Sequence, residues 1–288
     1  MSKNNKEKVI AVIVSYNPNL EELKNSIVNL LKQVFYVVVV NNSEYNLNFH
    51  INRVRIIELG KNFGIAYAQN VGMKWAYSKG ANFVLQMDQD SLIQENTVSE
   101  LLDCYTYLTE MGKNIGIVAG IDYDKDSGLA RIPKIFKGKI IEKEKYRSVT
   151  EVISSGSLIP KSVYENIGPL MNELFIDWVD SEYCWRAREK GFLVITDYEA
   201  KILHKLGFGE SKITKSKNFH SPFRLYYMTR NFIALFFRKR MPMHIRFSTI
   251  IKFFLNSYFV LASKDLLSRF YYFFKGFING LSLAFSQK

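Results

Sequence analysis

Residues 9–14 read Val-Ile-Ala-Val-Ile-Val, an uninterrupted apolar run that predicts a buried β-strand. Further strands are expected at four comparable runs, residues 36–40, 54–59, 82–87 and 115–119. Segments whose apolar residues recur with helical spacing separate some of these runs, at residues 20–31, 65–78 and 94–111. Continuous apolar strands that alternate with helices predict an α/β fold, a mostly parallel sheet covered by helices on both faces.

Residues 122–147 are polar and rich in lysine, which indicates an excursion or an edge hairpin before residues 149–159 return to a sheet-like composition. In open α/β sheets, ligands bind in the crevice beyond the carboxyl ends of the strands. The polar residues that follow the first four strands are therefore candidate site residues. They are Ser15, Tyr16, Asn17, Asn41, Asn42, Ser43, Lys61, Asn62, Asp88, Gln89 and Asp90.

The positive charge is concentrated towards the end of the chain. The 288 residues carry a formal net charge of +12 and 48% are hydrophobic, so we expect a folded protein with a sizeable core. Residues 1–204 hold 24 basic and 25 acidic side chains, whereas residues 205–288 hold 15 basic and 2 acidic ones. Cys104 and Cys184 are too few for a disulfide framework, and no signal-peptide apolar region follows the opening MSKNNKEK. These features predict a reducing, cytoplasmic compartment.

Two carboxylates follow a predicted buried strand, in the sequence Met87-Asp88-Gln89-Asp90-Ser91. In the turn after the strand, Asp88 and Asp90 can converge on one ligand. Two hard oxygen donors suit Mg²⁺ or Mn²⁺ that carries a phosphate. The alternative is ordinary turn chemistry, because Asp and Ser are common turn residues.

Several blocks carry a family resemblance, and they are residues 9–17 (VIAVIVSYN), 39–43 (VVNNS), 60–72 (GKNFGIAYAQNVG), 88–90 (DQD), 175–186 (FIDWVDSEYCWR) and 204–207 (HKLG). In this order they resemble the nucleotide-sugar-dependent glycosyltransferases of family 2, which have a GT-A fold. The pattern Phe-Ile-Asp-x-Val-Asp-x-Glu and the segment RLYYMTRN at 224–231 are similar to the bacterial rhamnosyltransferase branch. The resemblance implies a GT-A fold with a nucleotide-sugar site.

The resemblance places Ser15, Tyr16 and Asn17 beside the nucleotide base, with Tyr16 as a stacking or lining surface. The alternative for these residues is a strand-terminating turn ahead of Pro18. The position of Asn41 is usually an aspartate that hydrogen-bonds the pyrimidine or the ribose. An asparagine can still donate and accept there, but it carries no charge.

The resemblance also assigns Asn62, Gly64, Asn70, Asp88 and Gln89 to nucleotide-sugar binding. Gly64 would allow close backbone approach at the start of a helix, where the helix N-terminus favours negative charge. A helix cap by Asn62 is the alternative.

Asp177, Asp180 and Glu182 form an acidic cluster just before a helix-like stretch. By the resemblance, Asp180 is the general base of an inverting transfer, which removes the proton of the acceptor hydroxyl. Val179 stands where a glutamate is common in the family, and Asp177 and Glu182 are the fallback candidates. The alternative is N-capping of the following helix by Asp177 or Asp180, with Glu182 in its first turn.

The resemblance makes His204 a contact of the metal or the diphosphate, beside Asp88 and Asp90. A solitary histidine is more often a packed or surface residue. Arg224 and Arg230 are expected to bind the diphosphate, because a guanidinium can contact phosphate oxygens bidentately. The alternative is that these basic side chains only solvate a loop.

Residues 1–210 are expected to form the GT-A catalytic domain, and residues 211–288 a basic, aromatic-rich helical region. Its longest uncharged runs, 253–263 and 276–287, are too short to span a bilayer, which needs about 20 apolar residues. We expect these helices to lie on an anionic membrane surface at the inner face of the cell membrane. The alternative is packing on the catalytic domain or on a second copy in a homodimer.

The expected function is inverting transfer of L-rhamnose from dTDP-L-rhamnose to a saccharide or lipid-linked acceptor in bacterial cell-surface polysaccharide synthesis. Another donor, a UDP-hexose or UDP-galactofuranose, is the alternative within the family. A nucleotidyltransferase usually carries a glycine-rich basic loop where this chain has Ser-Tyr-Asn-Pro. A non-catalytic basic protein that binds membrane or nucleic acid is a further alternative, but nucleic acid is not an expected partner, because no binding motif accompanies the charge.

Overall fold

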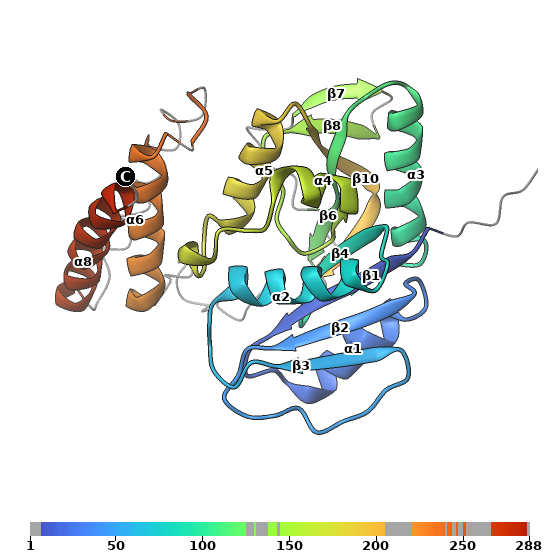
Figure 1. Cartoon of the computed structure of the whole chain (residues 1–288), viewed down its shortest axis with the longest axis horizontal. Helices are drawn as coiled ribbons and strands as arrows, with labels where there is room; N and C mark the ends of the chain where they lie inside the picture. The colour runs from blue at the N-terminus through green and yellow to red at the C-terminus, as the bar shows by residue number, and fades with distance from the viewer. Residues whose placement is uncertain are drawn as a thin grey trace, which may run out of the picture.

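The computed structural model describes residues 7–124, 130, 138–142, 145–204, 221–239, 241–243, 246, 250–251 and 266–286. Figure 1 shows a large sheet with helices on both faces and a pair of helices at one side. The strands are β1 (Val9–Ser15), β2 (Tyr36–Asn41), β3 (Val54–Glu58), β4 (Phe83–Asp88), β5 (Leu92–Ile93), β6 (Ile115–Asp124), β7 (Lys139–Glu142), β8 (Tyr146–Val149), β9 (Ser157–Pro160) and β10 (Leu193–His204). The helices are α1 (Leu20–Leu30), α2 (Ile65–Ser78), α3 (Thr97–Glu110), α4 (Lys161–Ile167), the 3₁₀ turn η1 (Asn172–Leu174), α5 (Val179–Glu189), α6 (Pro222–Phe237) and α8 (Leu266–Phe285).

The strands form one mixed sheet in the order β3-β2-β1-β4-β9-β6-β10-β8-β7, and β5 pairs with β10 outside this path. The first four strands are parallel, β9 is antiparallel to both of its neighbours, and β6 runs parallel to β10. The polar excursion returns as the antiparallel β7–β8 pair at the sheet edge. The helix-covered sheet and the edge hairpin are therefore as the sequence predicts, but the sheet is mixed rather than mostly parallel, because β5, β7, β8 and β9 pair in antiparallel fashion.

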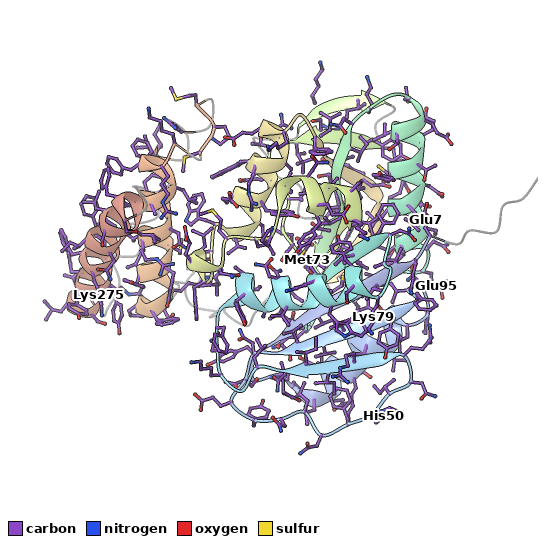
Figure 2. The ribbon with its side chains drawn as sticks, viewed as in Figure 1. Glu7, His50, Met73, Lys79, Glu95 and Lys275 are labelled. Carbon is purple, nitrogen blue, oxygen red and sulfur yellow. The ribbon has the colours of Figure 1, made fainter. Side chains whose placement is uncertain are left out.

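Alternate residues of β1 enter two separate cores. Ile10 and Val12 pack with buried residues of α2, α4 and α5, whereas Val9, Ala11 and Ile13 pack with those of α1 and α3. Because successive side chains of a strand point to opposite faces, this division confirms that helices cover both sides of the sheet. In Figure 2, Met73 of α2 lies inside the molecule, while the exposed Lys79, Glu95 and His50 lie on its surface.

Three predicted boundaries are wrong. Helix α3 begins at Thr97 rather than at residue 94, because the short β5 and the left-handed Asn96 precede it. Strand β6 continues past residue 119 to Asp124, where it pairs again with β10 after an irregularity. The stretch 149–159 is not a continuous strand. Val149 ends β8, residues 150–156 form a loop, and β9 covers residues 157–160.

Helices α6 and α8 pack closely against each other (Figure 1). A Cβ atom on Gly276 would lie 2.6 Å from the carbonyl oxygen of Tyr226, and one on Gly280 would lie 2.6 Å from that of Arg230. Asn279 also donates from Nδ2 to the hydroxyl of Tyr226. Residues 205–220 lie outside the described part of the chain, so the domain division at residue 210 stays a prediction.

Candidate functional site

The loops after β1, β2 and β4 meet at one edge of the sheet. Tyr16 donates its backbone N–H to Oε1 of Gln89 at 2.8 Å, and Gln89 donates from Nε2 to the carbonyl of Tyr16 at 3.4 Å. Asn17 donates its backbone N–H to the hydroxyl of Ser43 at 2.8 Å. The ring of Tyr16 is half exposed beside these bonds. Gln89 thus fixes the backbone of the loop that carries the half-exposed ring of Tyr16.

Asn41 is completely buried, and protein groups use both ends of its amide. Its Nδ2 donates to Oε2 of Glu58 and to the carbonyl of Tyr45, each at 2.6 Å, and its Oδ1 accepts from the N–H of Ser43 at 3.2 Å. An aspartate at this position would face the carboxylate of Glu58, which accounts physically for the amide. The role of Asn41 in nucleotide binding stays a prediction.

A second amide network shapes the loop before α2. Asn42 accepts from the N–H of Phe63 at 2.8 Å and donates to Oδ1 of Asn62 at 3.0 Å, and Asn62 in turn accepts from the N–H of Gly64 at 2.9 Å. The N-cap of α2 is Gly64, and no side chain caps this helix. The expectation that Asn62 caps the helix is therefore wrong, and Asn62 instead closes the turn before it.

Gly64 is required for a close contact between distant parts of the chain. Its φ is +86°, and a Cβ atom there would lie 2.5 Å from the ring of Phe175. Phe175 accepts the N–H of Ile65 at 2.7 Å. The backbone approach that Gly64 permits is thus to Phe175. Asn70, further along α2, donates to the carbonyl of Leu170 at 2.8 Å and accepts its N–H at 2.9 Å.

The end of β4 and the loop after it carry the two carboxylates of the predicted metal site, because Asp88 is the last residue of the strand and Asp90 follows it, and both are partly buried. Serine hydroxyls brace this loop, because the N–H of Asp88 donates to Ser155 at 3.2 Å and the Ser155 hydroxyl donates to Ser91 at 3.0 Å. Among the described residues, no group of three or more His, Cys, Asp or Glu forms a complete metal site. Two carboxylates nonetheless fit Mg²⁺ or Mn²⁺, which commonly combines one or two protein carboxylates with phosphate oxygens and water.

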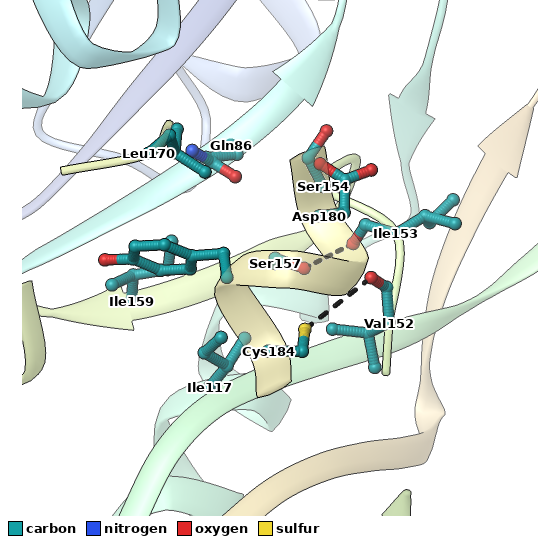
Figure 3. A pocket seen from close by; sticks show the side chains of 11 residues that line it. Gln86, Ile117, Val152, Ile153, Ser154, Ser157, Ile159, Leu170, Asp180 and Cys184 are labelled. Atoms are coloured by element: carbon teal, nitrogen blue, oxygen red, sulfur yellow. Dashed lines mark hydrogen bonds between the residues drawn. The ribbon is translucent and has the colours of Figure 1, made fainter. Parts of the chain in front are cut away.

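Asp180 is the second residue of α5 and lines a pocket at the edge of this loop (Figure 3). Burial raises the pKa of its carboxyl to about 7, and the negative charge of Asp88 adds to the rise. Hydrogen bonds from the backbone and side chain of Ser154 act in the opposite direction on this pKa. A carboxyl with a pKa near neutrality can both accept and release a proton at physiological pH, which suits a general base.

The rest of the pocket is mainly apolar and comes from β4, β6, β9, α5, the 150–156 loop and Leu170. Its other lining residues are Gln86, Ile117, Val152, Ile153, Ser154, Ser157, Ile159, Leu170, Tyr183 and Cys184. Figure 3 shows the Cys184 thiol directed to the carbonyl of Val152, at 3.8 Å. Burial raises the pKa of the Cys184 thiol well above its ordinary value, so this cysteine is a neutral packing group.

The two fallback carboxylates are held in ion pairs. Glu182 is buried and accepts from Nε and Nη2 of Arg186 at 3.0 and 2.9 Å, which favours a structural role. Asp177 accepts from Arg224 through Nε at 3.1 Å and Nη2 at 2.9 Å. The N-cap of α5 is Trp178, without a side-chain cap, so the expectation that Asp177 or Asp180 caps this helix is wrong.

The residues expected to contact the diphosphate or the metal lie in different surroundings. Arg224 is half exposed and holds Asp177, close in sequence to Asp180. Arg230 is directed inward, where Nη2 donates to the carbonyls of Glu173 and Leu174 at 2.5 and 3.0 Å. The side chain of His204 lies outside the described residues. Contacts of these three residues with a diphosphate or a metal stay predictions.

Sequence reasoning missed residues whose roles depend on partners distant in the chain. Glu58 ends β3 and holds Asn41, Ser154 contacts Asp180, and Asn231 of α6 bonds the loop before α5. The position of Glu58 at a strand end was a signal that could have identified it. No pattern near Ser154 indicates its contact. Asn231 ends the segment RLYYMTRN that carries part of the resemblance, but its spacing does not reveal a partner more than fifty residues away.

Similarity to known proteins identifies the family of this chain and its fold. Residues 10–168 match the family described as glycosyl transferase family 2. The chain is 35% identical over 271 residues to the dTDP-rhamnosyl transferase RfbF of Shigella flexneri, covering 89% of both proteins. It is 22% identical over 236 residues to the low-salt glycan biosynthesis hexosyltransferase Agl10 of Haloferax volcanii, covering 77% of this chain and 75% of that protein.

Solved structures share the fold. GalNAc-T7 with UDP, GalNAc and Mn²⁺ superposes with a TM-score of 0.60 at 12% identity, covering 87% of this chain and 54% of that one. TarS of S. aureus superposes with a TM-score of 0.54 at 17% identity, covering 87% of this chain and 43% of that one.

Proposed function

Because this chain belongs to glycosyl transferase family 2, we propose that it transfers L-rhamnose from dTDP-L-rhamnose to a saccharide acceptor with inversion at the anomeric carbon. Its activity as a glycosyltransferase and its GT-A fold follow from the family match, the relative and the structural neighbours. The observation that supports the donor is the 35% identity, over 89% of the chain, to a protein named a dTDP-rhamnosyl transferase. A lipid-linked saccharide in bacterial polysaccharide synthesis is the acceptor we propose.

In the proposed reaction, an acceptor hydroxyl oxygen attacks the anomeric carbon of the donor sugar. The new C–O bond forms as the bond to the diphosphate breaks, and the carboxylate of Asp180 takes the hydroxyl proton. The raised pKa of Asp180, about 7, supports this role. A single displacement of this kind inverts the configuration, because the oxygen attacks from the face opposite the leaving group.

Donor binding is assigned to the loops at the strand ends. The half-exposed ring of Tyr16, fixed by Gln89, offers a face for the thymine base. Ser15, Asn17, Asn41, Asn62, Gly64, Asn70 and Asp88 complete the proposed donor site, with Arg224 facing the diphosphate. Asp88 and Asp90, with His204, would hold Mg²⁺ or Mn²⁺, which when bound neutralises charge on the departing nucleoside diphosphate.

A donor competition tests the proposed specificity. Transfer from dTDP-L-rhamnose is measured against UDP-glucose, UDP-galactose and UDP-galactofuranose, with Mn²⁺ present and with EDTA. We expect turnover with dTDP-L-rhamnose and none after Asp180→Asn, which should still bind the donor. Binding of a UDP-sugar alone would refute the rhamnosyl donor, and near-normal turnover of Asp180→Asn would refute the base.

We also propose that α8 binds the enzyme to the inner face of the cell membrane. Among the described residues, no helix is long and apolar enough to cross a bilayer. The side of α8 away from α6 exposes large apolar side chains at helical spacing, and four of them are Leu267, Tyr271, Phe274 and Ile278. With 15 basic and 2 acidic residues in 205–288, this region suits an anionic lipid surface.

Co-sedimentation with vesicles tests the membrane proposal. We expect binding to vesicles that contain phosphatidylglycerol but not to pure phosphatidylcholine, and we expect high salt to release the protein. Leu267→Glu with Ile278→Glu should weaken binding, whereas Met111→Glu, at an exposed apolar residue of the α3 end, should not. A lipid-free dimer that the same two substitutions dissociate would instead assign this face to a second copy of the chain.

A further inference from the structure

The segment that leads into the proposed base has an unfavourable backbone. Phe175, Asp177 and Trp178 have φ values of +64°, +63° and +65°, a region that residues other than glycine rarely adopt. Phe175 has ψ of −64°, and the N–H of Ile176 donates to the carbonyl of Leu174 at 2.7 Å, which defines a tight γ-turn. Helix α5 begins directly after this segment, and Asp180 is its second residue. Such a conformation persists only where surrounding contacts enforce it.

One buried side chain contacts three carbonyls of this segment. Asn231 of α6 is completely buried, and its Nδ2 lies 2.7, 2.8 and 3.0 Å from the carbonyl oxygens of Leu174, Ile176 and Asp177. An amide nitrogen has two hydrogens, so three acceptors use its full donor capacity. Three carbonyls that point at one nitrogen fix the course of the segment.

Arg230 holds Asn231 in this orientation. Its Nε and Nη2 donate to Oδ1 of Asn231 at 2.9 and 2.7 Å, so the amide oxygen is turned away from the three carbonyls. The same guanidinium lies 4.7 Å from the ring centre of Tyr227, and that ring stacks on Phe175 at 4.7 Å. Trp178 adds a bond from Nε1 to the carbonyl of Met228. Helix α6 therefore contacts both ends of the segment.

We propose that Asn231 is a positioning residue of the transfer reaction, which places the carboxylate of Asp180 by holding segment 174–178, and that Arg230 orients Asn231 rather than binding the diphosphate. This inference rests on the proposed function of Asp180. It makes α6 part of the catalytic apparatus, although α6 lies beyond the portion that matches the family.

Steady-state kinetics of Asn231→Asp test the proposal. The substitution keeps the size of the side chain but replaces its donor with an oxygen that faces three carbonyls. We expect kcat to fall about 100-fold with little change in KM for the nucleotide sugar, because a small displacement of a catalytic group has this effect. The acid limb of the pH–rate profile should also move, because the burial of Asp180 changes. Arg230→Lys should show the same pattern more weakly, and it serves in place of Asn231→Asp if that variant does not fold.

Asn82→Ala is the control. Asn82 lies just before the start of β4, at the opposite edge of the sheet from the loops of the site, and its Oδ1 accepts from the backbone N–H of Lys8 at 2.9 Å. This control variant should lose some stability, while its kcat and the acid limb of its pH–rate profile should stay unchanged. A folded Asn231→Asp with wild-type kcat and pH profile would overturn the inference while Asp180→Asn stays inactive. If Arg230→Lys instead raises KM for the donor at unchanged kcat, Arg230 is a phosphate ligand and its positioning role is refuted. An active Asp180→Asn would refute the proposed function itself.

Discussion

Replacing Asp180 by asparagine should stabilise the protein at alkaline pH while it abolishes transfer. The pKa of Asp180 is raised from 3.8 to about 7, chiefly by burial and next by the charge of Asp88. Between these values the folded protein keeps the proton that the unfolded chain has released, so this carboxyl makes the folded state less stable as the pH rises through this window. Asparagine is neutral throughout and lacks this dependence.

The size of the effect follows from the shift. One pKa unit corresponds to about 1.4 kcal/mol, so the full penalty is about 4 kcal/mol, of which about 2 kcal/mol arises between about pH 5.5 and pH 8.5. The variant's free energy of unfolding should therefore exceed that of the wild type by about 2 kcal/mol more at pH 8.5 than at pH 5.5.

Urea unfolding followed by tryptophan fluorescence in EDTA measures this difference, since EDTA keeps divalent cations away from Asp88. Asp103→Asn, at an exposed position of α3, is the control for the same substitution at a surface carboxylate. A difference for Asp180→Asn that stays constant between the two pH values would show that Asp180 ionises normally in the folded protein, and the argument for a tuned base would fail.

Three further substitutions test the site. Gly64→Ala should cost about 2 kcal/mol or more in urea unfolding, because its Cβ would lie 2.5 Å from Phe175 at a φ of +86°; unchanged stability would contradict this packing. Asn41→Asp should destabilise the protein by about 1–3 kcal/mol, more at high pH, because a carboxylate would replace the amide that donates to Glu58. Adding Glu58→Gln to this variant should restore stability, and no recovery would contradict the Asn41–Glu58 hydrogen bond. Asp88→Asn should lose Mn²⁺-stimulated transfer in a radiolabelled-sugar assay, and retained stimulation would exclude Asp88 as a metal ligand.

Much of the fold is encoded locally. The alternation of β1 side chains between two cores and the bounds of α2 at Ile65–Ser78 follow from apolar spacing over a few residues. The placement of Asp88 and Asp90 at the end of a strand likewise needs only the run of residues before them. The boundaries of α3 and β6 were missed because they depend on pairing with β10, which is distant in sequence.

The sequence by itself determined the first strands, the helices that cover both sides of the sheet and the family whose motifs follow the strands, because each depends on short-range patterns of side chains. Only the tertiary structure decided what the acidic residues before and within α5 do. Glu182 and Asp177 are paired with arginines. The pKa of Asp180 is raised by burial and by the negative charge of Asp88, which belongs to a different element of the fold. Asn231 donates hydrogen bonds to the segment before Asp180, from more than fifty positions away in the chain. Local patterns of side chains cannot predict such a contact, because it forms only when distant segments meet in the folded protein.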